Sequence, residues 1–186
     1  MGETVIQTSS LGKRIKGKTI LEDISFEINK GDCVALIGPN GAGKTVLMSC
    51  ILGDKKPSSG QVLIDGKAGK AKNKIAVLLQ ENTIPNSLKV EELIAFFQSI
   101  SDNPLTNQEV QDLLQFKEDQ YQQFADKLSG GQRRLLAFVL CLIDKPKILF
   151  LDEPTAGMDT STRQRFWEIV NDLKKAGTTI LYSSHY

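Results

Sequence analysis

The sequence predicts an α/β fold in which helices cover both faces of a mainly parallel β-sheet. Short, continuously apolar stretches alternate with helical segments along the chain, and strands of this kind are buried on both faces in parallel sheets. A strand that leads into a helix is also the building unit of such a sheet. The 186 residues suffice for one domain, or for one domain with a small insertion.

The composition argues against several classes of protein. Lys and Arg number 23 and Asp and Glu number 22, so the formal net charge is +1. This balance disfavours a basic nucleic-acid-binding surface and an acidic disordered tail. The longest apolar run, residues 135–143, would span about 13 Å as a helix, against ~30 Å for a bilayer core. The N-terminus lacks the apolar centre of a signal peptide, and the cysteines lack metal-ligand spacing. We therefore expect a cytosolic protein.

The N-terminal part predicts an antiparallel β portion that leads into the first core strand. Ile24, Phe26 and Ile28 alternate with polar neighbours, as in a half-buried strand, and we expect residues 4–8 to pair with it. The continuous apolar run at residues 33–37 predicts the first strand of the parallel sheet.

The following segments continue the alternation. A helix is predicted at residues 44–52, ending at Gly53, with strands after it at 61–65 and 75–79. Residues 86–127 are mainly polar, with apolar residues at helical spacing, so we predict a small helical insertion there.

The C-terminal third predicts two more helices and two more strands. They are a buried helix at 131–143, a strand at 147–151, an amphipathic helix at 162–176 and a strand at 178–183. We expect one domain over residues 1–186. Its core would comprise 1–85 and 146–186, and its helical subdomain 86–145, including the buried helix.

A glycine-rich loop carries the first chemical motif. It fits the pattern G-x-x-x-x-G-K-[ST] with Gly38, Pro39, Asn40, Gly41, Ala42, Gly43, Lys44 and Thr45. Consecutive backbone N–H groups in such a loop form an anion nest, and the helix that begins near Lys44 adds the positive end of its dipole. We expect Lys44 to reach the β- and γ-phosphates of a nucleotide, Thr45 to bind Mg²⁺, and Val46 to complete the phosphate-binding set.

Two carboxylates end an apolar strand later in the chain. Asp152 and Glu153 follow residues 148–151, and ligand sites of parallel sheets lie at the carboxyl ends of strands. They would lie beside the loop at 38–45 if the two strands were neighbours. Alternation along the strand turns the two side chains different ways. Asp152 suits the Mg²⁺ shell, through water, and Glu153 suits polarising an attacking water molecule.

A third motif points to a family. The run Leu128-Ser129-Gly130-Gly131-Gln132 resembles the signature motif of ATP-binding-cassette (ABC) ATPases, whose core has the P-loop NTPase fold. Three further residues are similar to family motifs in the same order along the chain, and the resemblance covers essentially the whole chain. They are Gln80 as the Q-loop glutamine, Asp159 as the acid of the D-loop and His185 as the switch histidine.

The resemblance implies an ATP-binding and ATP-hydrolysing subunit of a membrane transporter. ATP would be clamped in a head-to-tail dimer, between the loop of one cassette and the signature residues of the other, with Asp159 nearby. The implied catalytic residues are Glu153, His185 and Lys44, and the implied ligands of Mg²⁺ are Thr45, Gln80 and Asp152. The implied partners are a second cassette and a transmembrane permease subunit on the cytoplasmic face of the cell membrane, without nucleic acid.

Two positions depart from the family pattern. The aromatic residue that stacks on adenine in the family corresponds to Ile15, which has no π face, so we expect ATP and GTP to bind with similar affinity. Only Tyr186 follows His185, so we expect a misplaced His185 side chain and slow hydrolysis.

Two other functions stay open, namely a nucleotide-binding regulatory cassette with little turnover and the ATPase of a soluble non-transport assembly, such as one for iron–sulfur cluster biogenesis. The short helical insertion disfavours chromosome-maintenance and DNA-repair heads, which carry a long coiled coil there. The single cassette disfavours two-cassette translation factors. Residues 82–93 and the ending 183–186 are similar to drug and polysaccharide exporter cassettes, so export is the expected direction.

Overall fold

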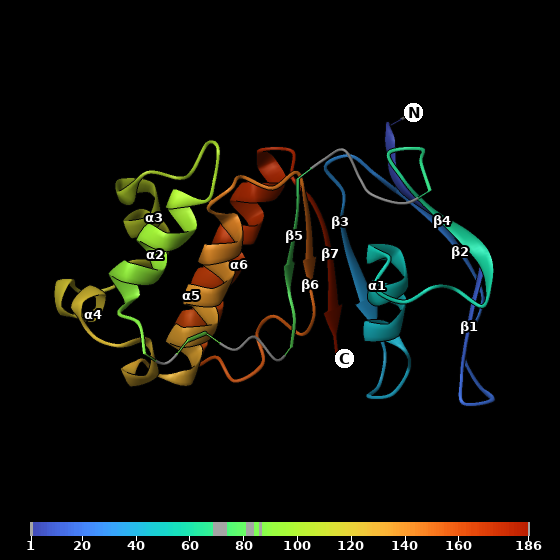
Figure 1. Ribbon diagram of the computed structural model, residues 1–186, viewed down its shortest axis with the longest axis horizontal. Helices are drawn as coiled ribbons and strands as arrows, with labels where there is room; N and C mark the ends of the chain where they lie inside the picture. The colour runs from blue at the N-terminus through green and yellow to red at the C-terminus, as the bar shows by residue number, and fades with distance from the viewer. Residues whose placement is uncertain (1, 69–73, 81–83, 86, 186) are drawn as a thin grey trace.

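The computed structural model describes residues 2–68, 74–80, 84–85 and 87–185 (Figure 1). Two β-sheets stand side by side with one helix between them, and the remaining helices cover the far face of the second sheet. Asn82, Asn86 and Tyr186, which belong to the exporter-like segments and to the predicted subdomain boundary, lie outside the described residues.

The N-terminal part forms a three-stranded antiparallel sheet. β1 (Thr4–Ile15) pairs with β2 (Lys18–Asn29) as a long hairpin, and β4 (Ser59–Ile64) pairs with the other edge of β1. The hairpin turns at Lys16 and Gly17, whose φ angles are 49° and 79°, as a two-residue turn of the primed type requires. The predicted antiparallel portion is confirmed, with a first strand much longer than expected.

Four parallel strands form the second sheet, in the order β3-β7-β6-β5. They are β3 (Cys33–Ile37), β5 (Ile75–Leu78), β6 (Ile148–Leu151) and β7 (Thr179–Ser184). The last residues of neighbouring strands lie in register, as when Ile37 faces Ser184 and Leu78 faces Leu151. The carboxyl ends of all four strands therefore meet at one edge, where ligand sites of such sheets form.

Alternation along β6 divides the hydrophobic core between the two faces of this sheet. Ile148 and Phe150 pack toward α1 (Lys44–Leu52) and the antiparallel sheet, whereas Leu149 and Leu151 pack toward the helices of the opposite face. All four side chains are at most 1% exposed. The predicted parallel sheet covered on both faces is confirmed, because each face has its own apolar layer.

The opposite face is covered by α5 (Gly130–Leu142) and α6 (Thr160–Lys175), whose Phe138 and Phe166 rings lie 4.4 Å apart. Smaller helices pack beyond them and share the same core: α2 (Val90–Ser99), α3 (Asn107–Leu114), α4 (Glu118–Gln122) and a 3₁₀ turn at Ala125–Lys127. Within the described residues, every helix is too short or too polar to cross a membrane.

Candidate functional site

The glycine-rich loop joins β3 to α1 at the carboxyl edge of the parallel sheet. Gly43 is its most crowded point, because φ is 91° and a Cβ there would lie 3.0 Å from Leu21 Cδ2 and 3.2 Å from the Ile20 carbonyl oxygen. Only glycine combines that backbone with so close an approach. At Gly41, where φ is 81°, a Cβ would meet nothing within 4 Å, so the loop backbone there is open to a ligand.

A cavity of about 380 Å³ opens over this loop. It is lined by residues 40–46 of the loop and the start of α1, and by Ile20, Gln80 and Glu153. The structure therefore brings together three predicted features that are far apart in the sequence: the loop, the glutamine after β5 and the second acid after β6.

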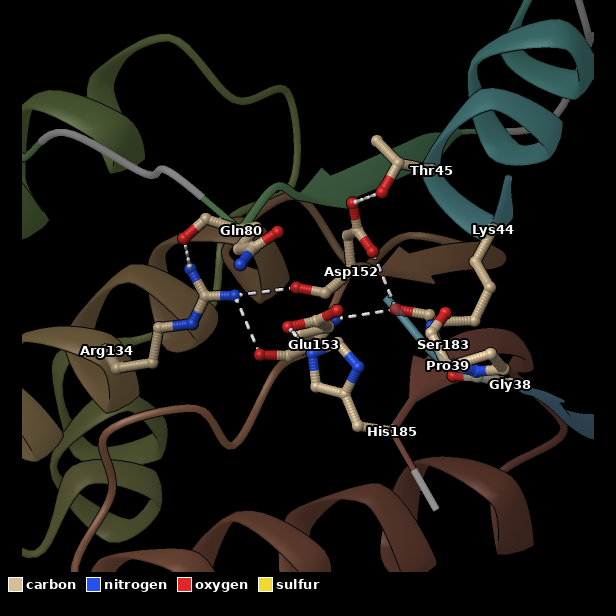
Figure 2. Close-up of polar contacts among 10 residues, drawn as sticks. All are labelled: Gly38, Pro39, Lys44, Thr45, Gln80, Arg134, Asp152, Glu153, Ser183 and His185. Atoms are coloured by element: carbon tan, nitrogen blue, oxygen red, sulfur yellow. Dashed lines mark hydrogen bonds and ion pairs between the residues drawn. The ribbon is translucent and has the colours of Figure 1, made fainter. Parts of the chain in front are cut away.

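Lys44 folds back over the loop, as Figure 2 shows. Its Nζ donates hydrogen bonds to the carbonyl oxygens of Gly38 at 2.6 Å and Pro39 at 3.0 Å. These two residues thus hold the lysine rather than line the cavity. The ammonium group is in place to exchange neutral carbonyl acceptors for phosphate oxygens, which form stronger charge-assisted hydrogen bonds.

Asp152 lies beneath the cavity and is only 2% exposed. Its Oδ2 accepts a hydrogen bond from Thr45 Oγ1 at 2.7 Å, and its Oδ1 accepts one from Ser183 Oγ at 2.6 Å (Figure 2). Asp152 was expected to lie beside the glycine-rich loop if the two strands were neighbours. It does lie there, although β3 and β6 are not neighbours, because β7 lies between them. The intervening strand supplies Ser183, and Thr45 reaches Asp152 across the end of that strand.

The oxygen atoms at this point are suitable ligands for a magnesium ion. Thr45 supplies a hydroxyl, Asp152 a carboxylate and Gln80 a side-chain amide oxygen, and Mg²⁺ prefers such oxygen ligands. Thr45 and Gln80 line one cavity, and Thr45 is hydrogen-bonded to Asp152. Across the described residues, no group of three or more His, Cys, Asp and Glu side chains is arranged to hold a metal. An ion here would therefore complete its shell with water and phosphate oxygens.

Glu153 combines an unusual backbone with a contact to the last strand. Its φ is 47°, a left-handed conformation that costs roughly 1–2 kcal/mol in a residue with a side chain. Its N–H donates to Ser183 Oγ at 2.8 Å, and its Oε2 contacts His185 Nε2. His185 follows β7, and Figure 2 shows its imidazole beside this carboxylate. His185 is not among the described residues that line the cavity, so its expected misplacement and slow hydrolysis stay predictions.

The signature residues lie outside the cavity of their own chain. Ser129 Oγ accepts from the Gln132 N–H at 3.2 Å, and Gln132 Oε1 accepts from the Ser129 N–H at 3.1 Å, so the two form a capping box at the start of α5. A Cβ on Gly131 would lie 3.1 Å from Asp159 Oδ2, which places the D-loop acid beside this helix start. Ser129 and Gly130 are exposed, and an exposed helix N-terminus can receive an anion from a partner.

Ile15 does not reach the cavity. It ends β1, paired with Lys18 beside the hairpin turn, and it is absent from the cavity lining. Ile20, further along the hairpin, lines the cavity and lies against Gly43. The aliphatic wall of the cavity therefore comes from a residue other than the predicted one.

Three residues of the site were missed by the sequence prediction: Ile20, Ser183 and Arg134. Arg134 belongs to it because its guanidinium donates hydrogen bonds to the carbonyl oxygens of Gln80 and Glu153. Ser183 carried a weak signal, because it is a polar residue in the strand that precedes His185. Arg134 carried a stronger one, because it is a charge directly before the longest apolar run, and a charge on a buried helix needs partners. Nothing in the sequence distinguishes Ile20 from its apolar neighbours.

Comparison with known families gives one match over most of the chain. The family model described as ABC transporter matches residues 21–156. Nod factor export ATP-binding protein I of Ralstonia nicotianae is 33% identical over 193 residues, which cover 98% of this chain and 60% of that protein. This chain therefore spans less than two thirds of that relative's length.

Solved structures share the fold. An ATP-binding cassette of an ABC transporter in its ADP conformation superposes with a TM-score of 0.81 at 25% identity, covering 98% of this chain and 81% of that one. A second cassette, a dimer in a post-hydrolysis state bound to ADP and Pi, has a TM-score of 0.81 at 20% identity, covering 97% of this chain and 88% of that one.

Proposed function

Because the chain belongs to the ABC transporter family, we propose that it is a subunit that binds and hydrolyses ATP to drive export across a membrane. One observation carries the proposal: the glycine-rich loop, Gln80 and Glu153 line a single cavity, with Asp152 bonded to Thr45 beneath it. The direction is supported by the resemblance to a relative named for Nod factor export.

Nucleotide binding uses the loop and the start of α1. The backbone N–H groups of residues 40–43 and the Lys44 ammonium bind the phosphates, because a left-handed glycine backbone leaves room for the oxygens. A Mg²⁺ ion held by Thr45, Asp152 and Gln80 would neutralise charge on the phosphates. Ile20 provides an apolar contact for the remainder of the nucleotide.

Hydrolysis uses Glu153 and His185. The Glu153 carboxylate lines the cavity and orients and polarises the attacking water molecule. His185 contacts that carboxylate and holds it at the cavity wall.

A second cassette completes the site in a head-to-tail dimer. Ser129, Gly130, Gly131 and Gln132 of one chain face the bound phosphates of the other, with Asp159 packed behind them. The exposure of Ser129 and Gly130 supports this arrangement, as does the dimeric state of the neighbour bound to ADP and Pi. In a two-fold dimer the same surface serves both subunits, so two sites form together.

The first experiment compares the wild type with Glu153→Gln. With ATP and Mg²⁺, the variant is expected to accumulate as a dimer in light scattering and to release no phosphate. The wild type is expected to release phosphate and to dimerise only transiently. Identical behaviour of the two proteins would contradict hydrolysis and favour a regulatory cassette with little turnover.

A mixing experiment tests the shared site. Lys44→Ala disables the loop and Ser129→Arg disables the helix start, so each variant alone is expected to be inactive. In an equal mixture, about a quarter of the sites combine an intact loop with an intact helix start, because half of the dimers are mixed and each has one such site. Activity that stays absent in the mixture would contradict the head-to-tail dimer.

The permease partner is tested by fractionation. We expect the chain to lie on the cytoplasmic face of the membrane. We also expect it to be recovered together with a transmembrane protein after the membranes are solubilised in detergent. Recovery only in a soluble complex would favour a non-transport assembly.

A further inference from the structure

Arg134 lies near the start of α5 and points toward the edge of the parallel sheet where the carboxyl ends of its strands meet. Figure 2 shows its guanidinium between the end of β5 and the loop that follows β6. The side chain is half-buried, and this desolvation lowers the pKa of the guanidinium. A desolvated charge requires good hydrogen-bond partners.

The partners of Arg134 are backbone carbonyl oxygens of two separate segments. Its N–H groups donate to Leu79 at 2.5 Å, Gln80 at 3.0 Å, Asp152 at 2.9 Å, Glu153 at 3.3 Å and Pro154 at 3.2 Å. Nη1 serves the first segment, while Nη2 and Nε serve the second. A planar guanidinium with five N–H groups can span both segments at once, whereas a lysine ammonium cannot.

The second segment contains the strained backbone of Glu153. Its φ of 47° persists only where neighbouring groups hold it. Ser183 Oγ accepts from the Glu153 N–H at 2.8 Å, and Arg134 donates to the carbonyl oxygen of the same residue at 3.3 Å. The residue is therefore held on both sides, once from β7 and once from α5.

We propose that Arg134 is a positioning residue, which locks Gln80 and Glu153 in fixed positions relative to the helix that begins with the signature residues. The proposal rests on the proposed function, since it assigns Arg134 to the hydrolysis step. A movement of α5 would be passed to the water-activating carboxylate and to the Q-loop glutamine together. Arg134 thus connects the surface that meets a second cassette with the chemistry of its own chain.

The loss of Arg134 is expected to act on turnover more than on binding. A misplacement of about 1 Å in a catalytic group can cost around 10²-fold in rate, while the loop residues that bind phosphate keep their own contacts. In steady-state ATP hydrolysis by the full chain, we expect Arg134→Gln to lower kcat about tenfold or more, with KM changed less than about threefold. Arg134→Lys keeps the charge without the planar fork, and we expect its kcat to stay below half of the wild-type value, roughly.

Arg165→Gln is the matched control. Arg165 is a half-buried arginine on α6, and it donates to the carbonyl oxygens of Leu113 and Asp112, away from the cavity. We expect it to lower the melting temperature like Arg134→Gln and to leave kcat near the wild-type value. Arg134→Lys with wild-type kcat, or equal losses of kcat in the two glutamine variants, would overturn the proposal.

Hydrogen exchange separates failure of this proposal from failure of the proposed function. We expect peptides covering residues 79–80 and 152–156 to exchange faster in Arg134→Gln than in the wild type and in Arg165→Gln. Unchanged exchange there would overturn the positioning role, whatever the activity. A wild type that releases no phosphate, together with faster exchange in Arg134→Gln, would overturn the proposed function and the assignment of Arg134 to hydrolysis.

Discussion

At the scale of single residues, Ser183 connects the two acids. It is 1% exposed, donates to Asp152 Oδ1 at 2.6 Å and accepts from the Glu153 N–H at 2.8 Å. Ser183→Ala removes both hydrogen bonds and is expected to lower the free energy of unfolding by about 1–3 kcal/mol, because it leaves buried groups unsatisfied. Urea denaturation measures the loss. The neighbouring variant Ser184→Ala should change stability by less than about 0.5 kcal/mol, and equal losses in both would contradict this account.

Nucleotide selectivity is a second property of single residues. Of the described residues that line the cavity, Ile20 is apolar and none is aromatic, so they offer the base an aliphatic wall in place of a stacking ring. We expect the dissociation constants for ATP and GTP to differ less than about tenfold, or about 1.4 kcal/mol. A competition titration with a fluorescent nucleotide tests this, and a strong preference for ATP would contradict it.

Some residues of the site could be predicted because their chemistry is contiguous in the sequence. The loop at 38–45 and the pair Asp152 and Glu153 each combine a pattern with a strand end. Arg134 and Ser183 could not be found in this way. Their roles depend on which strands are neighbours, and the position of β7 between β3 and β6 follows from pairing between distant segments.

At the scale of elements, Asp159 caps α6. Its carboxylate accepts from Ser161 Oγ at 2.7 Å, from the Thr162 N–H at 3.0 Å and from Thr162 Oγ1 at 2.7 Å. These hydrogen bonds, the one from Ser161 first, hold the pKa of the carboxyl well below its usual range. A carboxyl group whose pKa is lower in the folded than in the unfolded state stabilises the fold at pH values above its unfolded pKa. That contribution to stability disappears as the pH falls through the pKa of the folded state.

The expected result is a helix cap that weakens in acid. Stability should decline below about pH 4, where the unfolded carboxyl takes up a proton first. Asp159→Asn keeps a good capping residue and should make the decline shallower. Urea midpoints of both proteins at pH 7, about 4 and about 3 measure the difference. A decline of equal steepness in the two proteins would show that other carboxylates account for it.

The type and order of the helices and strands could be predicted more fully than the pairing of the strands. Hydrophobic period distinguishes helix from strand locally, as in the apolar run of β3 and the amphipathic pattern of α6. The sheet to which β4 belongs is decided by its pairing with β1. Such pairing depends on the register between distant segments, which no local pattern specifies.

At the scale of the whole molecule, β6 joins two hydrophobic clusters. Phe150 belongs to the cluster around α1, while Trp167 packs beside the other cluster, with its ring 5.2 Å from that of Phe166. Because both clusters rest on one sheet, we expect them to unfold together. Phe150→Ala should lower stability by about 3–5 kcal/mol.

The fluorescence of Trp167 reports this coupling from the opposite side of the sheet. It is the one tryptophan of the chain, so its transition follows the helical side. We expect the Trp167 transition in Phe150→Ala to shift together with the far-UV circular dichroism, as in a two-state protein. A Trp167 transition that stays at the wild-type denaturant concentration would show that the two sides unfold separately.

The left-handed backbone of Glu153 sets stability and activity against each other at one position. A φ of 47° suits asparagine better than glutamate, so Glu153→Asn is expected to raise stability by relieving part of a backbone strain of roughly 1–2 kcal/mol. Among the described residues that line the cavity, Glu153 is also the one acid. A library of variants screened for heat resistance alone would therefore become enriched in proteins that bind nucleotide and no longer turn it over. Directed evolution of a more robust form needs position 153 held constant.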